Sequence, residues 1–501
     1  MAEYNDTFLN LYKERLADYS TSNNVELQWP DLYRAQCFPG KKCKSCQLEN
    51  PENDFLFRNG DLFIVGMAPV SNADLNNPFQ CAAIRDSNGW ETVQAISYAI
   101  DDVNRREDVF PNTTIGYIIL NSCNQPVLTT KKFLEIFNNE LKYRNDTVIK
   151  DLSSRVLAVV AELGSSISQA AAKVLQEFNI VQVAYGSTAA VLSDRSEYKH
   201  FLRVSTPDIN QATAMVNIVK MLNSSYIQIL YSEGPYGEGA RDEIVSVAKS
   251  LKVCVANEIK VVEGKYSKIL DDLRRKNYAH IVLTFVKSHV VADVVNAITR
   301  DSDSFEFMLI ASEAFGTNNL LIQDNFKLEG SISLSLEIPF DKNRLRKYIY
   351  SKSTEKYNSN PWTRSYIENK NNCYLSGSFD KSTNTECKNV FEKYNATDFK
   401  FDNWPPFALN AAEVALKGSY GAYFEECRTT SKIICPGYRN NPKKVWESIR
   451  KQKLNVSGAE ISLFDENGDG SLGHVIYQIQ KPKHDPQGLV FVKVFKYASG
   501  I

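Results

Sequence analysis

VLAVVAELGSSIS, the stretch from residue 156 to residue 168, begins with five apolar residues and leads into a turn of Gly164, Ser165 and Ser166. A short apolar run of this kind is typical of a strand buried on both faces, and helical spacing follows over residues 166–178. Strand, turn and helix in this order form the repeating unit of parallel α/β sheets. Free N–H groups and hydroxyls at the start of the helix suit a small carboxylate, although N-capping by either serine is their commoner role.

The same alternation continues on both sides of this stretch. We expect strands at residues 62–66, 115–120, 181–185, 226–231, 255–262, 281–285 and 308–311. We expect helices at residues 91–103, 210–222, 239–251, 266–276, 290–298, 406–417 and 444–452, and short strands from 459 to 497. These units are too many for one small sheet, so the sequence predicts an α/β fold with two lobes, each on a parallel sheet. Residues 341–402 are rich in Asn, Lys, Ser and Tyr, and we expect surface insertions there after a helix at 342–350.

The composition of the 501 residues is that of a globular protein, with 43% hydrophobic and 23% charged residues. Lys and Arg number 58 and Asp and Glu 59, so the charge balance gives no reason to expect nucleic acid as a partner. The sequence has no apolar run long enough to span a membrane, and residues 1–16 are too polar for a signal peptide.

Ten cysteines and several Asn-x-Ser/Thr sequons indicate an oxidising, extracellular compartment. We therefore expect an ectodomain fragment whose leader and membrane part lie outside this sequence. Residues 1–52 form a separate segment in which Cys37, Cys43 and Cys46 suggest a disulfide-linked collar; Cys43 and Cys46 also have zinc-ligand spacing, but without a second pair. Glycosylation is expected at Asn112, Asn145, Asn223, Asn395 and Asn455.

A second strand end also carries hydroxyl side chains. The segment AYGST, residues 184–188, ends in Ser187 and Thr188, and Asp208 and Tyr236 follow further along the chain. Hydroxyl and N–H groups can hold a carboxylate, whereas an acid and an aromatic ring attract an ammonium group. Together these residues predict a site for a zwitterion.

Several linked segments resemble the ligand-binding ectodomain of class C G-protein-coupled receptors, above all metabotropic glutamate receptors and the calcium-sensing receptor. They are GSS at 164–166, AYGSTAAVLSD at 184–194, FLRV at 201–204 with Asp208, QATAM at 211–215 and EGPYGE at 233–238. ASEAF at 311–315 is similar to the calcium-sensing receptor, and LFDENGD at 463–469 to a late turn of both groups. The resemblance runs from about Gly60 to the C-terminus.

The resemblance implies a bilobed Venus flytrap, similar to periplasmic binding proteins, with two doubly wound parallel-sheet lobes joined by hinge strands. Lobe 1 would comprise residues 53–205 and 337–457, and lobe 2 residues 206–336 and 458–501. The ligand would lie in the cleft between the lobes, and cleft closure would signal. The resemblance also implies a non-enzymatic protein, a homodimer formed through lobe 1, and a G protein reached only through a transmembrane part.

By the same resemblance, Ser165 and the backbone near Thr188 would hold an α-carboxylate, with Ser166 and Ser187 beside them. The Thr188 hydroxyl, Asp208 and Glu313 would hold the α-ammonium, and Tyr236 would pack over it. Gly186 stands where many relatives have Ser or Ala, which would leave space in the cleft.

The side-chain pocket departs from glutamate receptors, which hold the distal carboxylate with basic residues. Thr92 and Trp404 occupy two of those positions, and Arg85 is the basic residue that remains in that region. Burying a carboxylate without its cations is costly, so we expect an α-amino acid other than glutamate, with Trp404 and Trp90 suiting an apolar or aromatic side chain. Core or hinge packing of Trp404 is an equally good interpretation.

The resemblance further implies disulfides Cys81–Cys123, Cys373–Cys387 and Cys427–Cys435. In relatives the counterpart of Cys254 bonds to a cysteine-rich domain that lies outside this sequence, which leaves open a pairing of Cys254 with Cys37, Cys43 or Cys46. It implies no cofactor, although calcium could bind at the cleft. DENGDG at 465–470 begins like a calcium-binding loop, but Ile476 stands where the bidentate Glu would be, so a turn between strands is expected. The alternative functions are a flytrap domain of a receptor kinase or guanylate cyclase, a soluble binding protein and, last, a hydrolase.

Overall fold

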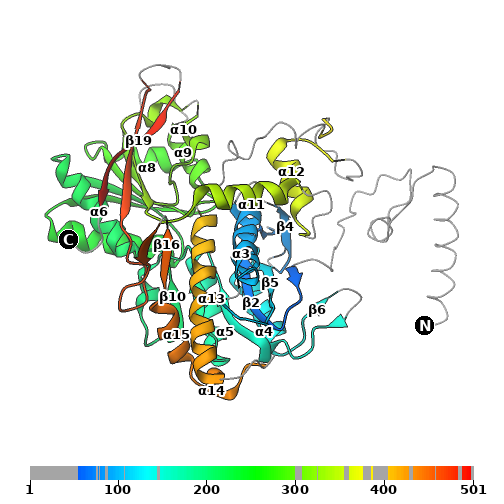
Figure 1. Ribbon diagram of the computed structural model, residues 1–501. Helices are drawn as coiled ribbons and strands as arrows, with labels where there is room; N and C mark the ends of the chain where they lie inside the picture. The colour runs from blue at the N-terminus through cyan, green and yellow to red at the C-terminus, as the bar shows by residue number, and fades with distance from the viewer. Residues whose placement is uncertain are drawn as a thin grey trace, which may run out of the picture. The chain divides into compact units, whose positions relative to one another are not determined.

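The computed structural model describes residues 55–74, 77, 79–84, 88–106, 108–143, 147–299, 307–323, 325–354, 360–375, 385–387, 404–427, 433–456, 458–482 and 488–497. The chain divides into two compact units, Met1–Asn53 and Asp54–Ile501. The predictions for residues 1–52, with their three cysteines, and for Arg85, Asn145 and Asn395 lie outside the described residues. All that follows concerns the second unit (Figure 1).

The first sheet has the strand order β1-β5-β2-β8-β9-β10. Its central strands are β2 (Leu62–Ala68), β5 (Ile115–Asn121) and β8 (Val156–Val160), which are parallel and buried along their whole length. The strands β9 (Gln182–Ala184) and β10 (Phe201–Arg203) extend it in parallel, while β1 (Phe55–Arg58) pairs antiparallel with β5 at the opposite edge. The continuous apolar runs of the sequence are therefore the fully buried parallel strands, as predicted.

Helices cover both faces of this sheet. One face packs against α3 (Asn88–Asn104) and α13 (Pro405–Cys427), which lie side by side in Figure 1. The other face packs against α4 (Pro126–Phe137) and α5 (Ser165–Glu177). The sequence prediction missed β1, β10 and α4.

The second sheet has the order β12-β11-β13-β14-β15-β18-β19. Its parallel part consists of β12 (Cys254–Val261), β11 (Tyr226–Ser232), β13 (Ile281–Phe285), β14 (Met308–Ala311) and β15 (Ile332–Leu336). The strands β18 (His474–Gln480) and β19 (Val490–Tyr497) are added antiparallel. Helices α6 (Asp208–Met221) and α7 (Pro235–Ser250) pack on one face, and α8 (Ile269–Arg274) and α9 (Val291–Thr299) on the other. The fold is thus the two-sheet α/β architecture that the sequence predicts.

The chain passes between the two sheets three times. It crosses from β10 to α6, from β15 to α11 (Lys342–Thr354), and from the hairpin β16–β17 (Lys453–Val456, Ala459–Ser462) to β18. Before that hairpin, α14 (Pro436–Arg439) and α15 (Pro442–Arg450) follow α13. Each sheet is therefore built from segments that are far apart in the sequence.

The helix α12 (Thr363–Asn371) corrects the prediction that residues 341–402 are surface insertions throughout. Trp362, Tyr366 and Ile367 are buried in the core of the first lobe. The ring of Tyr366 stacks on Trp90 at 4.1 Å, and its hydroxyl donates to Glu91 Oε1 at 2.6 Å. This segment closes over α3 because its three apolar side chains need a core, although polar residues surround them in the sequence.

Candidate functional site

A cavity of about 110 Å³ lies between the two sheets, at the ends of their strands. It brings together six residues of the predicted ligand set: Ser165, Ser166, Thr188, Tyr236, Glu313 and Trp404. Turns after parallel strands provide most of them, because the carboxyl ends of such strands meet at one edge of a sheet. Its other lining residues are Pro69, Asn124, Leu163, Gly164, Gly186, Pro235, Lys287, Ser288, His289 and Ala314.

The start of α5 forms one wall of the cavity. Gly164 is the N-cap, without a side-chain hydrogen bond, so capping by Ser165 or Ser166 is wrong. The first helical hydrogen bond runs from Ser168 N–H to Gly164 O at 2.9 Å, which leaves the amides of the first turn without partners inside the helix. Ser165 Oγ accepts the N–H of Ala189 at 3.1 Å and thereby ties this wall to the loop of Thr188. Its hydroxyl proton can still be donated to a ligand.

Thr188 connects the two sides of the cavity. Its hydroxyl donates to Glu313 Oε1 at 3.5 Å, and its carbonyl accepts the N–H of Asp208 at 2.8 Å. The neighbouring Ser187 does not face the cavity, contrary to expectation. Its hydroxyl donates to Ser168 Oγ at 2.6 Å and to Glu162 O at 3.1 Å inside the protein, so it fixes the loop rather than a ligand.

Asp208 and Glu313 form a buried pair of acids beside Thr188, with only 1% and 6% of their surfaces exposed. Both Asp208 carboxylate oxygens and Glu313 Oε2 have no hydrogen-bond partner among the described residues. Burial raises the pKa of Glu313 to about 7. Burial and, second, the charge of Glu313 raise the pKa of Asp208 well above its usual range. Glu313 lines the cavity, whereas Asp208 lies behind Thr188 and does not.

Tyr236 covers the second-sheet side of the acid pair. Its hydroxyl shares a hydrogen bond of 2.9 Å with Ser312 Oγ, and its ring packs against Phe285 with the centroids 5.6 Å apart. Burial raises the pKa of Tyr236, so the phenol stays neutral and its ring face remains available to a cation.

The predicted side-chain pocket is formed only in part. Trp404 lines the cavity and packs on Phe407 at 5.4 Å, so the aromatic wall exists on that side. Trp90 is buried in the core and donates to Thr363 Oγ1 at 2.9 Å, so its predicted role in the pocket is wrong. Thr92 is buried on α3 and does not line the cavity.

Gly186 does not leave space, contrary to expectation. A Cβ at this position would meet Leu163 Cδ1 at 2.5 Å and Trp404 Cε3 at 3.2 Å. Leu163 therefore fills the volume that the missing side chain vacates, and the cavity is closed on this side.

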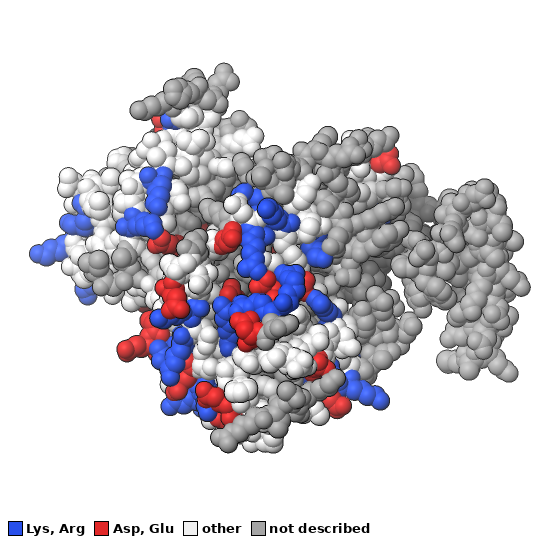
Figure 2. All heavy atoms as spheres, in the orientation of Figure 1, with Lys and Arg blue, Asp and Glu red and all other residues white. Residues whose placement is uncertain are grey.

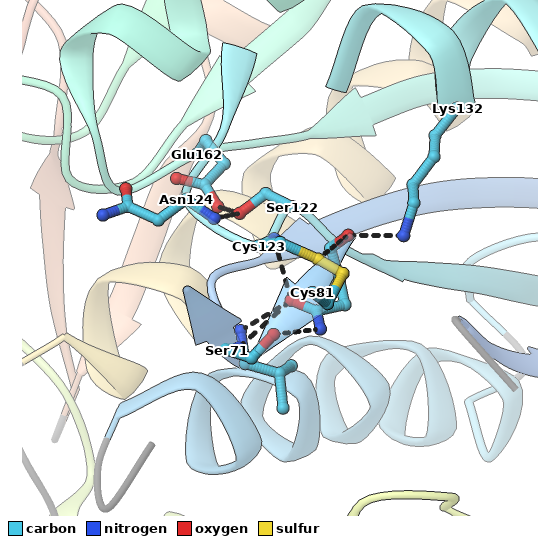
Figure 3. The surroundings of a disulfide bond; sticks show 9 residues. Ser71, Cys81, Ser122, Cys123, Asn124, Lys132 and Glu162 are labelled. Carbon is cyan, nitrogen blue, oxygen red and sulfur yellow. Dashed lines mark hydrogen bonds between the residues drawn. A yellow bond between two sulfur atoms is a disulfide. The ribbon is translucent and has the colours of Figure 1, made fainter. Parts of the chain in front are cut away.

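Two charged residues escaped the sequence prediction. Lys287 lines the cavity from the end of β13, directly after a buried strand, which was the available signal. Glu162 is fully buried beneath the cavity loop and accepts the N–H groups of Leu163 at 2.6 Å and Gly164 at 3.0 Å. Figure 3 shows its second contact, with the Ser122 hydroxyl at 2.6 Å, beside the disulfide of Cys123.

The match to known families agrees with this geometry. Residues 91–384, more than half of the chain, match the model of the receptor family ligand-binding region. The chain belongs to this family. Class C receptor ectodomains and related receptors carry this domain, so the resemblance found in the sequence is confirmed at the level of this family. The domain is a two-lobe, periplasmic-binding-protein-like fold, and ligand binding is its general function.

Among the described residues, the structure forms the three disulfides that the resemblance implies: Cys81–Cys123, Cys373–Cys387 and Cys427–Cys435. They fit an extracellular location. Cys254 is exposed and unpaired within the described residues. Asn112, Asn223 and Asn455 are exposed, as glycosylation would require.

The surface of the receptor domain carries both signs of charge. On the face drawn in Figure 2, basic and acidic side chains lie interspersed. Some of the charged residues form ion pairs, such as Lys444 with Glu426 at 2.6 Å. Among the described residues, none of the helices combines the length and apolar character that crossing a bilayer requires. The same residues hold no group of three or more His, Cys, Asp or Glu side chains that could bind a metal ion.

Proposed function

We propose that this chain is the extracellular ligand-binding domain of a class C G-protein-coupled receptor, and that it binds an α-amino acid other than glutamate between its lobes. The observation that carries the proposal is the buried acid pair Asp208 and Glu313, in which three carboxylate oxygens have no hydrogen-bond partner among the described residues. Buried carboxylates require a cation or a proton. A primary ammonium group supplies the charge and three donors.

The opposite wall suits the other end of a zwitterion. The first turn of α5 offers amides without helical partners and the hydroxyl of Ser165, which together bind a carboxylate. Because the two walls belong to different sheets, a ligand that contacts both favours the arrangement in which they are close together. In a homodimer formed through lobe 1, closure of the cleft would then be transmitted to a transmembrane part and from there to a G protein.

The side chain of the ligand would meet Trp404, which favours an apolar or aromatic group. Lys287 is the competing feature, because its ammonium could hold a distal carboxylate. We do not propose calcium as the principal ligand, because the acid pair supplies only two carboxylate side chains and calcium takes six to eight oxygens. A receptor kinase or cyclase flytrap would have the same cleft with another output.

The test is a thermal-shift comparison of the secreted domain with matched ligands. L-Phenylalanine should raise the unfolding midpoint, corresponding to about 2.7 kcal/mol at 100 times its Kd. 3-Phenylpropionate, which lacks the ammonium, and phenethylamine, which lacks the carboxylate, should not. Glu313→Gln should abolish the shift, whereas Glu243→Gln, an acid of α7 that does not line the cavity, should keep it. A larger midpoint shift with L-glutamate than with L-phenylalanine would refute the exclusion of glutamate. If none of the amino acids shifts the midpoint, the proposal is refuted.

A further inference from the structure

The turn at residues 465–470, which begins like a calcium-binding loop in the sequence, lies on the segment that crosses from the hairpin β16–β17 to β18. Asp465 N–H and Asp469 O form one hydrogen bond of 2.9 Å across it, and Asp469 N–H donates to Asp465 Oδ1 at 2.9 Å. The turn is therefore closed by its own backbone and by the side chain of Asp465. The carboxylate of Asp469 also accepts a hydrogen bond from Asn467 Nδ2 of the same turn at 2.8 Å, and Asp469 is 2% exposed.

Asp469 binds a fully buried guanidinium. Arg203 Nε donates to Asp469 Oδ1 at 2.6 Å, and its backbone N–H donates to Gly468 O at 3.1 Å. Arg195 Nη2 reaches the same carboxylate oxygen at 2.8 Å. The charges of Arg203 and Arg195 outweigh burial and hold the pKa of Asp469 below its usual range.

The other side of the guanidinium holds the loop of Thr188. Arg203 Nη1 donates to Ser187 O at 3.2 Å and to Ala189 O at 2.8 Å, the two carbonyls that flank Thr188. Arg203 Nη2 donates to Ser193 Oγ at 2.6 Å at the end of the same segment. Arg203 does not line the cavity itself.

The close approach of the turn to β10 depends on Gly470. A Cβ at this position would lie 2.5 Å from Ser205 O and 2.4 Å from Ser205 C. Ser205 Oγ in turn donates to Ser187 O at 3.1 Å, so the crossing segment, the end of β10 and the Thr188 loop pack as one unit.

We propose that Arg203, held by Asp469 of the crossing turn, is a positioning residue for ligand binding: its guanidinium fixes the backbone on both sides of Thr188 without touching the ligand. A fork of fixed donors can hold two carbonyls and a carboxylate at once, which a lysine ammonium on a flexible stem cannot reproduce. The inference rests on the proposed function only for the statement that Thr188 contacts the ligand.

The test separates positioning from general stability. Arg203→Lys keeps the charge opposite Asp469 but loses the two-carbonyl contact. The matched control is Arg439→Lys, because Arg439 Nη2 also donates to two carbonyls, Ser153 O at 3.0 Å and Val156 O at 2.8 Å, away from the cavity. The readouts are hydrogen exchange of the Ala189 and Asp208 amides, which are bonded to Ser165 Oγ and Thr188 O, and the midpoint shift by L-phenylalanine.

Arg203→Lys should raise exchange at both amides at least tenfold and raise the Kd for L-phenylalanine at least tenfold, whereas Arg439→Lys should change neither by more than about twofold. If the Ala189 and Asp208 amides exchange no faster in Arg203→Lys than in Arg439→Lys, the proposal is overturned. If exchange rises as expected but L-phenylalanine does not shift even the wild-type protein, positioning of the loop is supported and the amino-acid function fails.

Discussion

The clearest consequence of the cavity geometry concerns Glu162 and pH. Its carboxyl is fully buried, and burial raises its pKa from 4.5 to about 7, although hydrogen bonds from Ser122, Gly164 and Leu163 oppose the shift. Folding therefore takes up a proton at this residue between those two pH values. A carboxyl with a raised pKa destabilises the folded state when it is ionised, so its cost is absent below pH 4.5 and complete above pH 7.

The size of the effect follows from the two pKa values. A difference of about 2.5 between the folded and unfolded pKa corresponds to about 3 kcal/mol. Glu162→Gln removes the titration but keeps an oxygen that can accept the N–H groups of Leu163 and Gly164. Between pH 5 and pH 8, we expect the free energy of unfolding of wild-type protein to fall relative to this variant by up to about 3 kcal/mol.

Urea unfolding followed by tryptophan fluorescence suits the measurement. Four of the five tryptophans, Trp90, Trp362, Trp404 and Trp446, pack in or against the core of the lobe that contains Glu162, so most of the signal reports the relevant unit. The measurement is made without reductant, which keeps the disulfides intact. Parallel curves of unfolding free energy against pH for wild type and Glu162→Gln would refute the reasoning, because the Glu162 carboxyl would then titrate alike in the folded and unfolded states.

Glu313 provides the internal comparison, because burial raises its pKa to about 7 as well. In the absence of ligand, Glu313→Gln should show the same pH-dependent gain in the free energy of unfolding relative to wild type. A saturating amino acid should lower the pKa of Glu313 through its ammonium and so reduce the gain at this position, while leaving the gain at Glu162 unchanged. Equal responses of the two variants to ligand would contradict the placement of Glu313 at the ammonium.

Three further expectations can be checked by the same unfolding assay. Gly186→Ala should lower the free energy of unfolding by about 1–3 kcal/mol, because its Cβ would overlap Leu163. Gly239→Ala is the control and should be neutral or stabilising, because nothing lies within 4 Å of its Cβ. Equal costs of the two substitutions would contradict the packing. His474 is buried, and burial lowers its pKa from 6.5 to about 4, so stability should fall by up to about 3 kcal/mol as the pH falls from 6.5 to 4, and His474→Phe should lose this dependence. Serine at both ends of the Cys81–Cys123 disulfide, which spans 42 residues, should cost about 4 kcal/mol; a loss below 1 kcal/mol would show that the turn holds without it.

The sequence predicted those parts of the fold whose signal is local. The run at residues 156–160 is a strand at the predicted bounds, because five apolar side chains in a row admit burial on both faces. The segment of α12 was not recognised as core, because Trp362, Tyr366 and Ile367 lie among polar residues and meet their partner α3 more than 270 positions away in the sequence. Local periodicity carries no information about such a contact.

The candidate site shows the same division. Ser165 and Thr188 could be named because each follows a strand and carries a group that binds a zwitterion, whereas Glu313 was named only through the resemblance to class C receptors. The buried ion pair of Arg203 and Asp469 could not be found, because 266 positions separate its partners and an Arg is normally a surface residue. Ser187 was misplaced for a different reason: adjacent loop residues point in different directions, and composition does not say which one faces the cavity.

The acid pair also bears on why a ligand would be needed for closure. With the walls placed as in this structure, three carboxylate oxygens of Asp208 and Glu313 have no hydrogen-bond partner within the part of the chain that the structure describes, and burial raises both pKa values. An empty cleft in this arrangement therefore either keeps two desolvated charges or takes up protons, and both cost free energy relative to an open cleft that water can enter. An ammonium group removes that cost only when the walls are together. On the proposed function, the acids therefore contribute to signalling twice: they bind the ligand, and they disfavour the closed arrangement in its absence.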